Sequence, residues 1–327
     1  MKSINFVILG DYNLIAAELG KKGTATDLAI YDRKTSDVIY TWAAPITFPD
    51  KIQSLMQTIN IAEYAVLNVT KIDKYLGEQI IALDSVNFRD GFILHSYEVD
   101  EEKLRTLIKD TSVSHFKFLD SLDQLKQEMS RLESKGHIDG PVIIPIDHAF
   151  DVKGVGTVVL GVVKQGSVKV YDQLKIMPSG KDIVVKSIQM HDDPVNESKS
   201  PARVGLAVKG MTAEQIARGD ILCSEDSSSS HVKVVSPVAA TAADTASTIA
   251  STDFMKNSYY KGDLAENQTY LISVGLQIKP VRLKLLDGLG VEIVPKNRPI
   301  VFFPGQTYVL LKPDSQGTRI IGKGILH

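Results

Sequence analysis

From Pro141 onward the sequence shows almost no helical periodicity, and short runs of β-branched residues alternate with turn residues. The clearest run is Lys153-Gly-Val-Gly-Thr-Val-Val-Leu-Gly161, in which valines and a threonine stand between glycines. Turn residues follow at short intervals, as in Pro178-Ser-Gly180 and Arg218-Gly-Asp220. Short strands at this spacing, with Gly and Pro between them, are typical of a compact all-β barrel. The pattern therefore predicts a β-barrel domain over residues 138–226.

A second β-rich segment follows a run of four serines. Ser227–Ser230 come directly after two acidic residues, a composition typical of a flexible linker. Residues 231–327 then return to short apolar strands with Gly and Pro between them, for example Thr269–Val274 and Tyr308–Leu311. We therefore expect a second β-barrel domain over residues 231–327.

The first third of the chain has a different pattern, in which short apolar runs alternate with helical periods. The expected strands are Asn5–Leu9, Leu28–Tyr31, Val38–Trp42, Ala65–Val69 and Phe92–His95. The expected helices are Ile52–Ile59, Tyr75–Ser85, Glu101–Lys109 and Ser121–Glu133, the last with Ser121 as its N-cap. This alternation predicts an α/β domain with a mostly parallel sheet over residues 1–137.

Composition excludes several classes of function. The chain has 327 residues and one cysteine, Cys223, so an internal disulfide and a thiolate metal cluster are both excluded. The apolar runs have the length of strands, so we expect no membrane span. The seven histidines lack metal-ligand spacing, and no serine stands in a nucleophile elbow. We therefore expect a cytoplasmic monomer with no cofactor, no metal site and no catalytic residue.

The net charge of −2 is unevenly distributed. Residues 227–327 carry 11 Lys and Arg against 7 Asp and Glu, whereas the rest of the chain is slightly acidic. An excess of cations suits a phosphate backbone, although an ordinary solvated surface explains so small an excess equally well.

The segment 138–226 resembles the second domain of the elongation factor Tu family of translation factors. The matching motifs, in the family's order and spacing, include Asp147-His-Ala-Phe150, the glycine-rich run quoted above, Arg203-Val-Gly-Leu206 and Ala217-Arg-Gly-Asp-Ile-Leu222. Residues 231–327 resemble the third domain. Within them, Phe254-Met-Lys-Asn-Ser-Tyr-Tyr-Lys261 and Val274-Gly-Leu-Gln277 resemble the selenocysteine-specific branch, which occurs in archaea and eukaryotes. That branch often has a fourth domain, and this chain stops before one.

The first third resembles the GTPase domain of the family only in its layout. The family's phosphate loop, G-x-x-x-x-G-K-[ST], follows the first strand and surrounds phosphates with backbone N–H groups, a lysine and a hydroxyl. Here the corresponding segment is Gly10–Ala17, in which Ile15, Ala16 and Ala17 replace the second glycine, the lysine and the threonine, and Asp11 adds a negative charge. The segment Gly20–Thr24 has a loose similarity to a phosphate loop, but it is expected to follow a helix.

The two other nucleotide motifs of the family also have no counterpart at the expected places. The γ-phosphate sensor D-x-x-G maps onto Ala44-Pro-Ile-Thr47, which has neither the aspartate nor the glycine. The guanine reader N-K-x-D maps onto Tyr97-Glu-Val-Asp100, where only the last carboxylate remains. The loss of all three motifs indicates a degenerate GTPase domain that binds no GTP.

The resemblance also implies a site in the barrel. In the selenocysteine branch the aminoacyl end of tRNA is bound by an acidic residue, an adjacent His or Arg, and a more distant Arg; these map onto Asp147, His148 and Arg203. A selenol is an anion at neutral pH, which two cations beside one carboxylate would favour. If the three converge, we expect a solvent-open cluster in which Arg203→Ala weakens tRNA binding without disturbing the fold. A surface ion pair inherited without function is the competing interpretation.

The sequence as a whole therefore predicts a translation factor-like protein that binds RNA, either aminoacyl-tRNA or the ribosome, without binding or hydrolysing GTP. Two alternatives stay open. One is a GTPase with a non-standard nucleotide site, and the other is a regulatory module in which the domains have become a protein-docking surface.

Overall fold

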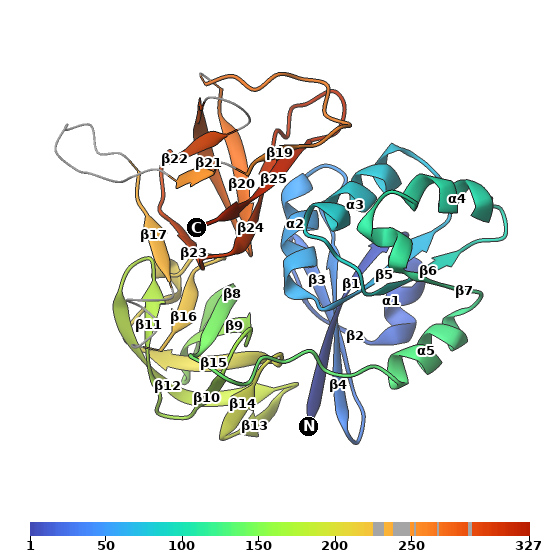
Figure 1. Cartoon of the computed structure of the whole chain (residues 1–327). Helices are drawn as coiled ribbons and strands as arrows, with labels where there is room; N and C mark the ends of the chain where they lie inside the picture. The colour runs from blue at the N-terminus through green and yellow to red at the C-terminus, as the bar shows by residue number, and fades with distance from the viewer. Residues whose placement is uncertain (225–231, 238–248, 252, 267, 287–289) are drawn as a thin grey trace. The chain divides into compact units, whose positions relative to one another are not determined.

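The structure is a computed structural model that describes residues 1–224, 232–237, 249–251, 253–266, 268–286 and 290–327. The described residues form two compact units, Met1–Gly136 and His137–His327 (Figure 1). The linker predicted at Ser227–Ser230 lies outside the described residues. No helix in the described ranges is both long and apolar enough to cross a membrane.

The first unit is an α/β layer built on a seven-stranded sheet with the order β2-β3-β4-β1-β5-β6-β7. Strand β1 pairs in parallel with β4 and β5, and β5, β6 and β7 continue the parallel part, whereas β3 pairs antiparallel with β2 and β4. The strands are β1 (Lys2–Gly10), β2 (Lys21–Ala25), β3 (Leu28–Lys34), β4 (Val38–Pro45), β5 (Tyr64–Val69), β6 (Gly91–His95) and β7 (Lys117–Leu119). The helices are α1 (Asn13–Leu19), α2 (Ile52–Ile61), α3 (Lys74–Ser85), α4 (Glu101–Ile108) and α5 (Leu122–Ser130).

Helices cover both faces of this sheet (Figure 1). Helices α1 and α5 pack on the face of β1 that carries Ile4, Phe6 and Ile8, and their Leu19 and Leu125 belong to the same buried cluster. Aromatic rings fill the middle of this core: Phe6 stacks on Trp42 with ring centroids 6.0 Å apart. Burial of large apolar side chains stabilises this layer.

The α/β architecture predicted for the first third is confirmed. Ser121 is the N-cap of α5, since its hydroxyl accepts a hydrogen bond from the backbone N–H of Gln124. Helix α1 and the short strands β2 and β7 were not expected. Helix α1 has no sequence signal at its start, because its N-cap residue Tyr12 makes no side-chain capping bond. The segment Gly20–Thr24 follows α1 and runs mostly along the edge strand β2, as expected for a segment that is not a phosphate loop.

The second unit begins with a closed antiparallel barrel. Its sheet has the order β11-β16-β8-β9-β15-β12-β13, and an additional pairing of β11 with β12 closes the ring. The barrel encloses an aliphatic core that includes Ile146, Val159 and Leu206. The strands are β8 (Ile143–Val152), β9 (Gly156–Val162), β10 (Ser167–Lys169), β11 (Gln173–Met177), β12 (Lys181–Met190), β13 (Asp193–Val195), β14 (Glu197–Lys199), β15 (Arg203–Lys209) and β16 (Ile221–Cys223).

A second β-barrel follows, with a core of its own that includes the buried Tyr270, Phe302 and Tyr308. Its main sheet has the order β18-β22-β21-β20-β24-β25-β19, and β17 pairs with β23 beside it. The strands are β17 (Lys233–Val235), β18 (Ile249–Ser251), β19 (Met255–Lys256), β20 (Tyr270–Val274), β21 (Gln277–Leu285), β22 (Val291–Pro295), β23 (Ile300–Phe302), β24 (Gln306–Leu311) and β25 (Ile320–Leu326). The predicted succession of an α/β domain and two barrels is confirmed.

An apolar strip joins the two barrels within the second unit. Ile221 and Cys223 of the first barrel pack in one buried cluster with Val232 and Val301 of the second. Beside this strip the backbone of Gly219, at φ +88°, approaches Gln277 so closely that a Cβ atom on Gly219 would lie 2.8 Å from the Gln277 backbone nitrogen. The two barrels therefore share a tightly packed contact.

Candidate functional site

A β-bulge in the first barrel positions Asp147. In the pairing of β8 with β9, Ile146 lies opposite Gly161 and His148 lies opposite Leu160, so Asp147 is the extra residue between them. Regular alternation would turn Asp147 away from the interior that holds Ile146. The bulge instead leaves both side chains buried, and Asp147 is 1% exposed.

Arg203 and His148 both contact the carboxylate of Asp147. Arg203, the first residue of β15, donates from Nη2 to Oδ1 at 2.8 Å and from Nε to Oδ2 at 3.2 Å. The Nδ1 atom of His148 lies 2.6 Å from Oδ1. The three residues predicted from the sequence as a site are thus brought together by the barrel. A bidentate arginine–carboxylate pair of this kind is stronger and more directional than a single contact between charges.

Arg218 is a fourth member of the cluster that the sequence did not indicate as a site residue. It lies in a tight turn, fixed where the Asp220 carboxylate accepts the Ala217 N–H at 2.8 Å. From this turn, Arg218 donates from Nε to the backbone carbonyl of Asp147 at 2.9 Å, and its Nη2 lies 3.3 Å from Nε2 of His148. The motif Ala217–Leu222 is visible in the sequence, and its arginine stands next to a turn glycine. That position is the sequence feature from which Arg218 could have been proposed as a site residue.

Two arginines meet a single carboxylate in this cluster, which consists of Asp147, His148, Arg203 and Arg218. Arg203 contacts the carboxylate itself, whereas Arg218 contacts the backbone carbonyl of Asp147 and lies beside Nε2 of His148. The two guanidinium groups and the Asp147 carboxylate together contribute a net charge of +1.

The expectation that the whole cluster is open to solvent is wrong. The side chain of Asp147 is 0% exposed and that of Arg203 only 15% exposed. Both carboxylate oxygens of Asp147 accept hydrogen bonds from within the cluster, so this carboxylate is not available to an external amino group. Arg203 is also no surface cation, because it compensates a buried negative charge. What the cluster can offer a ligand is the positively charged edge formed by its arginines.

Acid should weaken the fold through Asp147. Burial raises the pKa of this carboxyl group, but the Arg203 charge and the His148 hydrogen bond outweigh burial, so the pKa lies below its ordinary value. The ionised carboxylate therefore stabilises the folded unit above the unfolded-state pKa of about 3.9, and this stabilisation is lost as the pH falls through the folded-state pKa. We expect Asp147→Asn to lower the free energy of unfolding at neutral pH, and the gap to wild type to shrink in acid. Urea unfolding across this pH range measures the gap; a gap that stays constant would contradict the expectation.

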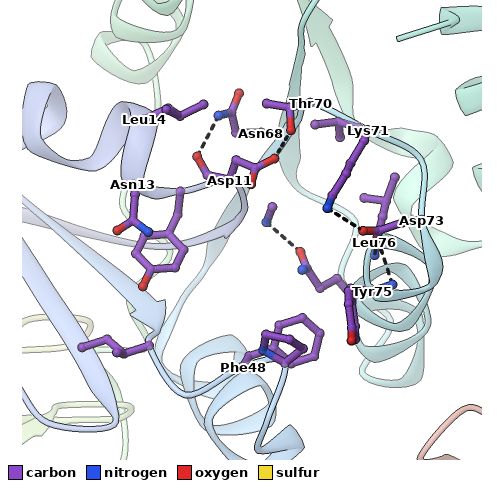
Figure 2. Close-up of a pocket in the computed structure, with 16 residues that line it drawn as sticks. Asp11, Asn13, Leu14, Phe48, Asn68, Thr70, Lys71, Asp73, Tyr75 and Leu76 are labelled. Atoms are coloured by element: carbon purple, nitrogen blue, oxygen red, sulfur yellow. Dashed lines mark hydrogen bonds and ion pairs between the residues drawn. The ribbon is translucent and has the colours of Figure 1, made fainter. Parts of the chain in front are cut away.

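In the first unit, the segment expected to hold a phosphate loop makes its hydrogen bonds within the protein. The N–H of Gly10 donates to Oε1 of Gln79 at 2.6 Å, and the N–H of Asp11 donates to the Asn68 carbonyl at 2.9 Å. The Asp11 carboxylate accepts from the Thr70 hydroxyl (Figure 2). In a phosphate loop such N–H groups point at the ligand. Here two of them are already satisfied, and a carboxylate stands beside them.

The other two mapped segments have structural roles. Ala44 and Pro45 belong to strand β4, and the backbone N–H of Thr47 bonds to the Asp27 carbonyl. The carboxylate of Asp100, the last trace of the guanine reader, accepts the N–H of Lys103 as the N-cap of α4. Among the described residues, no group of three or more His, Cys, Asp and Glu side chains is placed to hold a metal ion.

Comparisons with known proteins agree with this fold. The sequence profile of elongation factor Tu domain 2 matches residues 156–223. An uncharacterized protein of Methanocaldococcus jannaschii is 34% identical over 327 residues, which is 100% of both chains. The selenocysteine-specific elongation factor of the same organism is 34% identical over 170 residues, 46% of this chain and 36% of that protein. The crystal structure of translation elongation factor SelB from Methanococcus maripaludis, in complex with the GTP analogue GppNHp, covers 100% of this chain and 79% of its own, with a TM-score of 0.83 and 22% identity.

The α/β layer and the two barrels that follow it have the fold of the SelB structure. The chain is homologous to the selenocysteine-specific elongation factors, and its first barrel contains the segment that matches elongation factor Tu domain 2.

Proposed function

We propose that this chain is a translation factor that binds the aminoacyl end of tRNA through the first barrel and works without a GTP cycle. The observation that carries the proposal is the cluster of Asp147, His148, Arg203 and Arg218, in which two arginines meet one buried carboxylate at the position implied by the family resemblance. A homologue that matches 46% of this chain is named a selenocysteine-specific elongation factor. A role of this kind places the protein in the cytoplasm, beside the ribosome.

The cluster favours an anionic ligand group for an electrostatic reason. The carboxylate of Asp147 pairs with Arg203 and is buried, so its negative charge does not face the ligand. Arg218 adds a second cation, and it is partly exposed. A phosphate of the tRNA end or an ionised side chain of the amino acid would gain charge-assisted hydrogen bonds there. In this proposal Asp147 is a positioning residue, and the arginines meet the ligand.

Arg218→Gln is the sharpest test of this proposal. The variant removes one of the two cations of the cluster and keeps a donor for the Asp147 carbonyl, which accepts from Nε of Arg218. We expect charged tRNA to bind at least about tenfold more weakly at low salt, equivalent to about 1.4 kcal/mol. Filter binding or fluorescence anisotropy measures this loss.

The matched control is Arg282→Gln, which removes an exposed arginine of the second barrel. If both variants lose affinity equally, binding is a general effect of charge. If Arg218→Gln binds like wild type, the cluster is inherited without function.

The second part of the proposal is the lack of a GTP cycle. We expect GTP and GDP with Mg²⁺ to bind more weakly than about 1 mM, a free energy of no more than about 4 kcal/mol. The reason is that Asp11 stands where phosphates would lie and that the Gly10 N–H is held by Gln79. Isothermal titration calorimetry provides the measurement. Micromolar binding of either nucleotide would favour a GTPase with a non-standard site.

A further inference from the structure

The first unit contains a hollow of about 540 Å³ that the barrel site does not use. The walls come from the segment that leads from the end of β1 into α1 (Gly10–Leu14), the segment after β4 (Ile46, Phe48 and Pro49), the end of β5 with the two residues after it (Asn68–Lys71), and helix α3 with its N-cap (Figure 2). Strands β4 and β5 lie on opposite sides of β1, so the order of the parallel strands reverses here. Ligands of open α/β sheets bind at such a reversal, outside the carboxyl ends of the strands.

The hydrogen-bond donors around this hollow are mostly bonded to other protein groups, so few remain to bind an anion. The Gly10 N–H donates to Gln79. The first N–H groups of α3, those of Tyr75 and Leu76, both donate to Asp73 at 2.9 Å. The ammonium group of Lys71, the lysine in the wall, lies 3.2 Å from the Asp73 carboxylate. Donors that would meet a phosphate are therefore occupied by oxygens of the protein.

The Asp11 carboxylate, by contrast, has no cationic partner among the described residues. Its side chain accepts one hydrogen bond, from the neutral hydroxyl of Thr70. Lys71 and Asp73 compensate each other, so the wall as a whole carries one uncompensated negative charge, on Asp11. A half-buried carboxylate with a neutral partner gains a strong, charge-assisted hydrogen bond from a cationic ligand.

Aromatic rings add a second preference. Tyr12, Phe48 and Tyr75 line the hollow, and the rings of Phe48 and Tyr75 meet edge to face with centroids 6.2 Å apart. In the view of Figure 2, Asp11 and Thr70 lie at one end and Phe48 at the other. Aromatic faces attract organic cations and also bury an apolar body.

We propose that this hollow binds a small organic ammonium ion with an aromatic or apolar body. The ammonium group bonds to Asp11 and Thr70, and the body packs against Phe48 and Tyr75. This site goes beyond the proposed tRNA function. It would bind a cation in the segment that holds anionic phosphates in a GTPase.

Three probes with the same body test the proposal on the full chain: 2-phenylethylammonium, neutral 2-phenylethanol and anionic 3-phenylpropionate. We expect the ammonium ion to bind at least about tenfold more tightly than the alcohol, and the carboxylate to bind more weakly than either. Ligand-observed NMR titration measures all three. In Asp11→Asn the ammonium ion should fall to the affinity of the alcohol. The control Asp110→Asn, which replaces an exposed aspartate after α4, should leave the order unchanged.

The order of the three probes on wild-type protein tests the proposal even if Asp11→Asn fails to fold. The proposal is overturned if no probe binds below about 10 mM, a free energy of about 3 kcal/mol. It is also overturned if the carboxylate binds as well as the ammonium ion, or if a folded Asp11→Asn variant binds the ammonium ion like wild type. Micromolar binding of GDP would contradict both this site and the GTP-independent function, whereas failure of the ammonium probe alone leaves the tRNA proposal intact.

Discussion

Arg203→Ala should lower the free energy of unfolding of the second unit by about 3 to 5 kcal/mol. The variant removes both hydrogen bonds that Arg203 donates to Asp147 and leaves a fully buried carboxylate with His148 as its remaining side-chain partner in the cluster. An unpaired buried charge costs far more than the loss of an exposed ion pair, which is worth about 0 to 1 kcal/mol. Chemical denaturation followed by far-UV circular dichroism measures the loss.

The double variant Asp147→Asn/Arg203→Ala separates the two explanations for such a loss. With the buried charge removed, its loss of stability should be smaller than that of Arg203→Ala alone, although it lacks more native groups. An equal or larger loss would mean that Arg203 stabilises the barrel through packing of its side chain and not through compensation of Asp147.

Gly10→Ala should destabilise the first unit by at least about 3 kcal/mol. Gly10 has φ +72°, a conformation that side chains rarely adopt, and a Cβ atom there would lie 1.9 Å from the backbone oxygen of Asn68. The neighbouring strand β5 would have to move, and the hydrogen bond from the Asp11 N–H to Asn68 would break. Thermal unfolding of the variant and of wild type gives the difference.

Gly77→Ala provides the matched control for this substitution. Gly77 lies in helix α3, and a Cβ atom there meets nothing within 4 Å. Alanine is better than glycine in a helix interior by about 0.8 to 1 kcal/mol, so this variant should be more stable than wild type. If Gly10→Ala were as stable as wild type, the close approach of β1 to β5 would not constrain the fold.

Much of the fold could be predicted from the pattern of apolar residues. The strands and the longer helices of the first unit stand where periodicity placed them, because each has an apolar face that needs burial. Helix α1 escaped prediction because it has seven residues and no capping side chain. The short strands β2 and β7 are stabilised by pairing with β3 and β6, and such partners cannot be read from a local sequence.

The sequence predicted which residues form most of the candidate site, but it did not predict their burial or their contacts. The spacing of Asp147, His148 and Arg203 matched a known pattern, and the barrel brings the three together. The burial of Asp147 was not predictable, since it depends on one bulge that breaks the alternation of β8. Arg218 was not predicted because its Nε contacts a backbone carbonyl, an atom that any residue at position 147 would present.

The apolar strip between the barrels gives the molecule a built-in chemical reporter. Its Cys223 is the only cysteine of the chain and is 0% exposed, packed beside Val301 of the second barrel. A thiol reagent can therefore react only when this strip opens, and the rate of modification measures how often it does. The rate at which Cys223 is modified therefore reports how often the contact between the two barrels opens, and the measurement needs no introduced label.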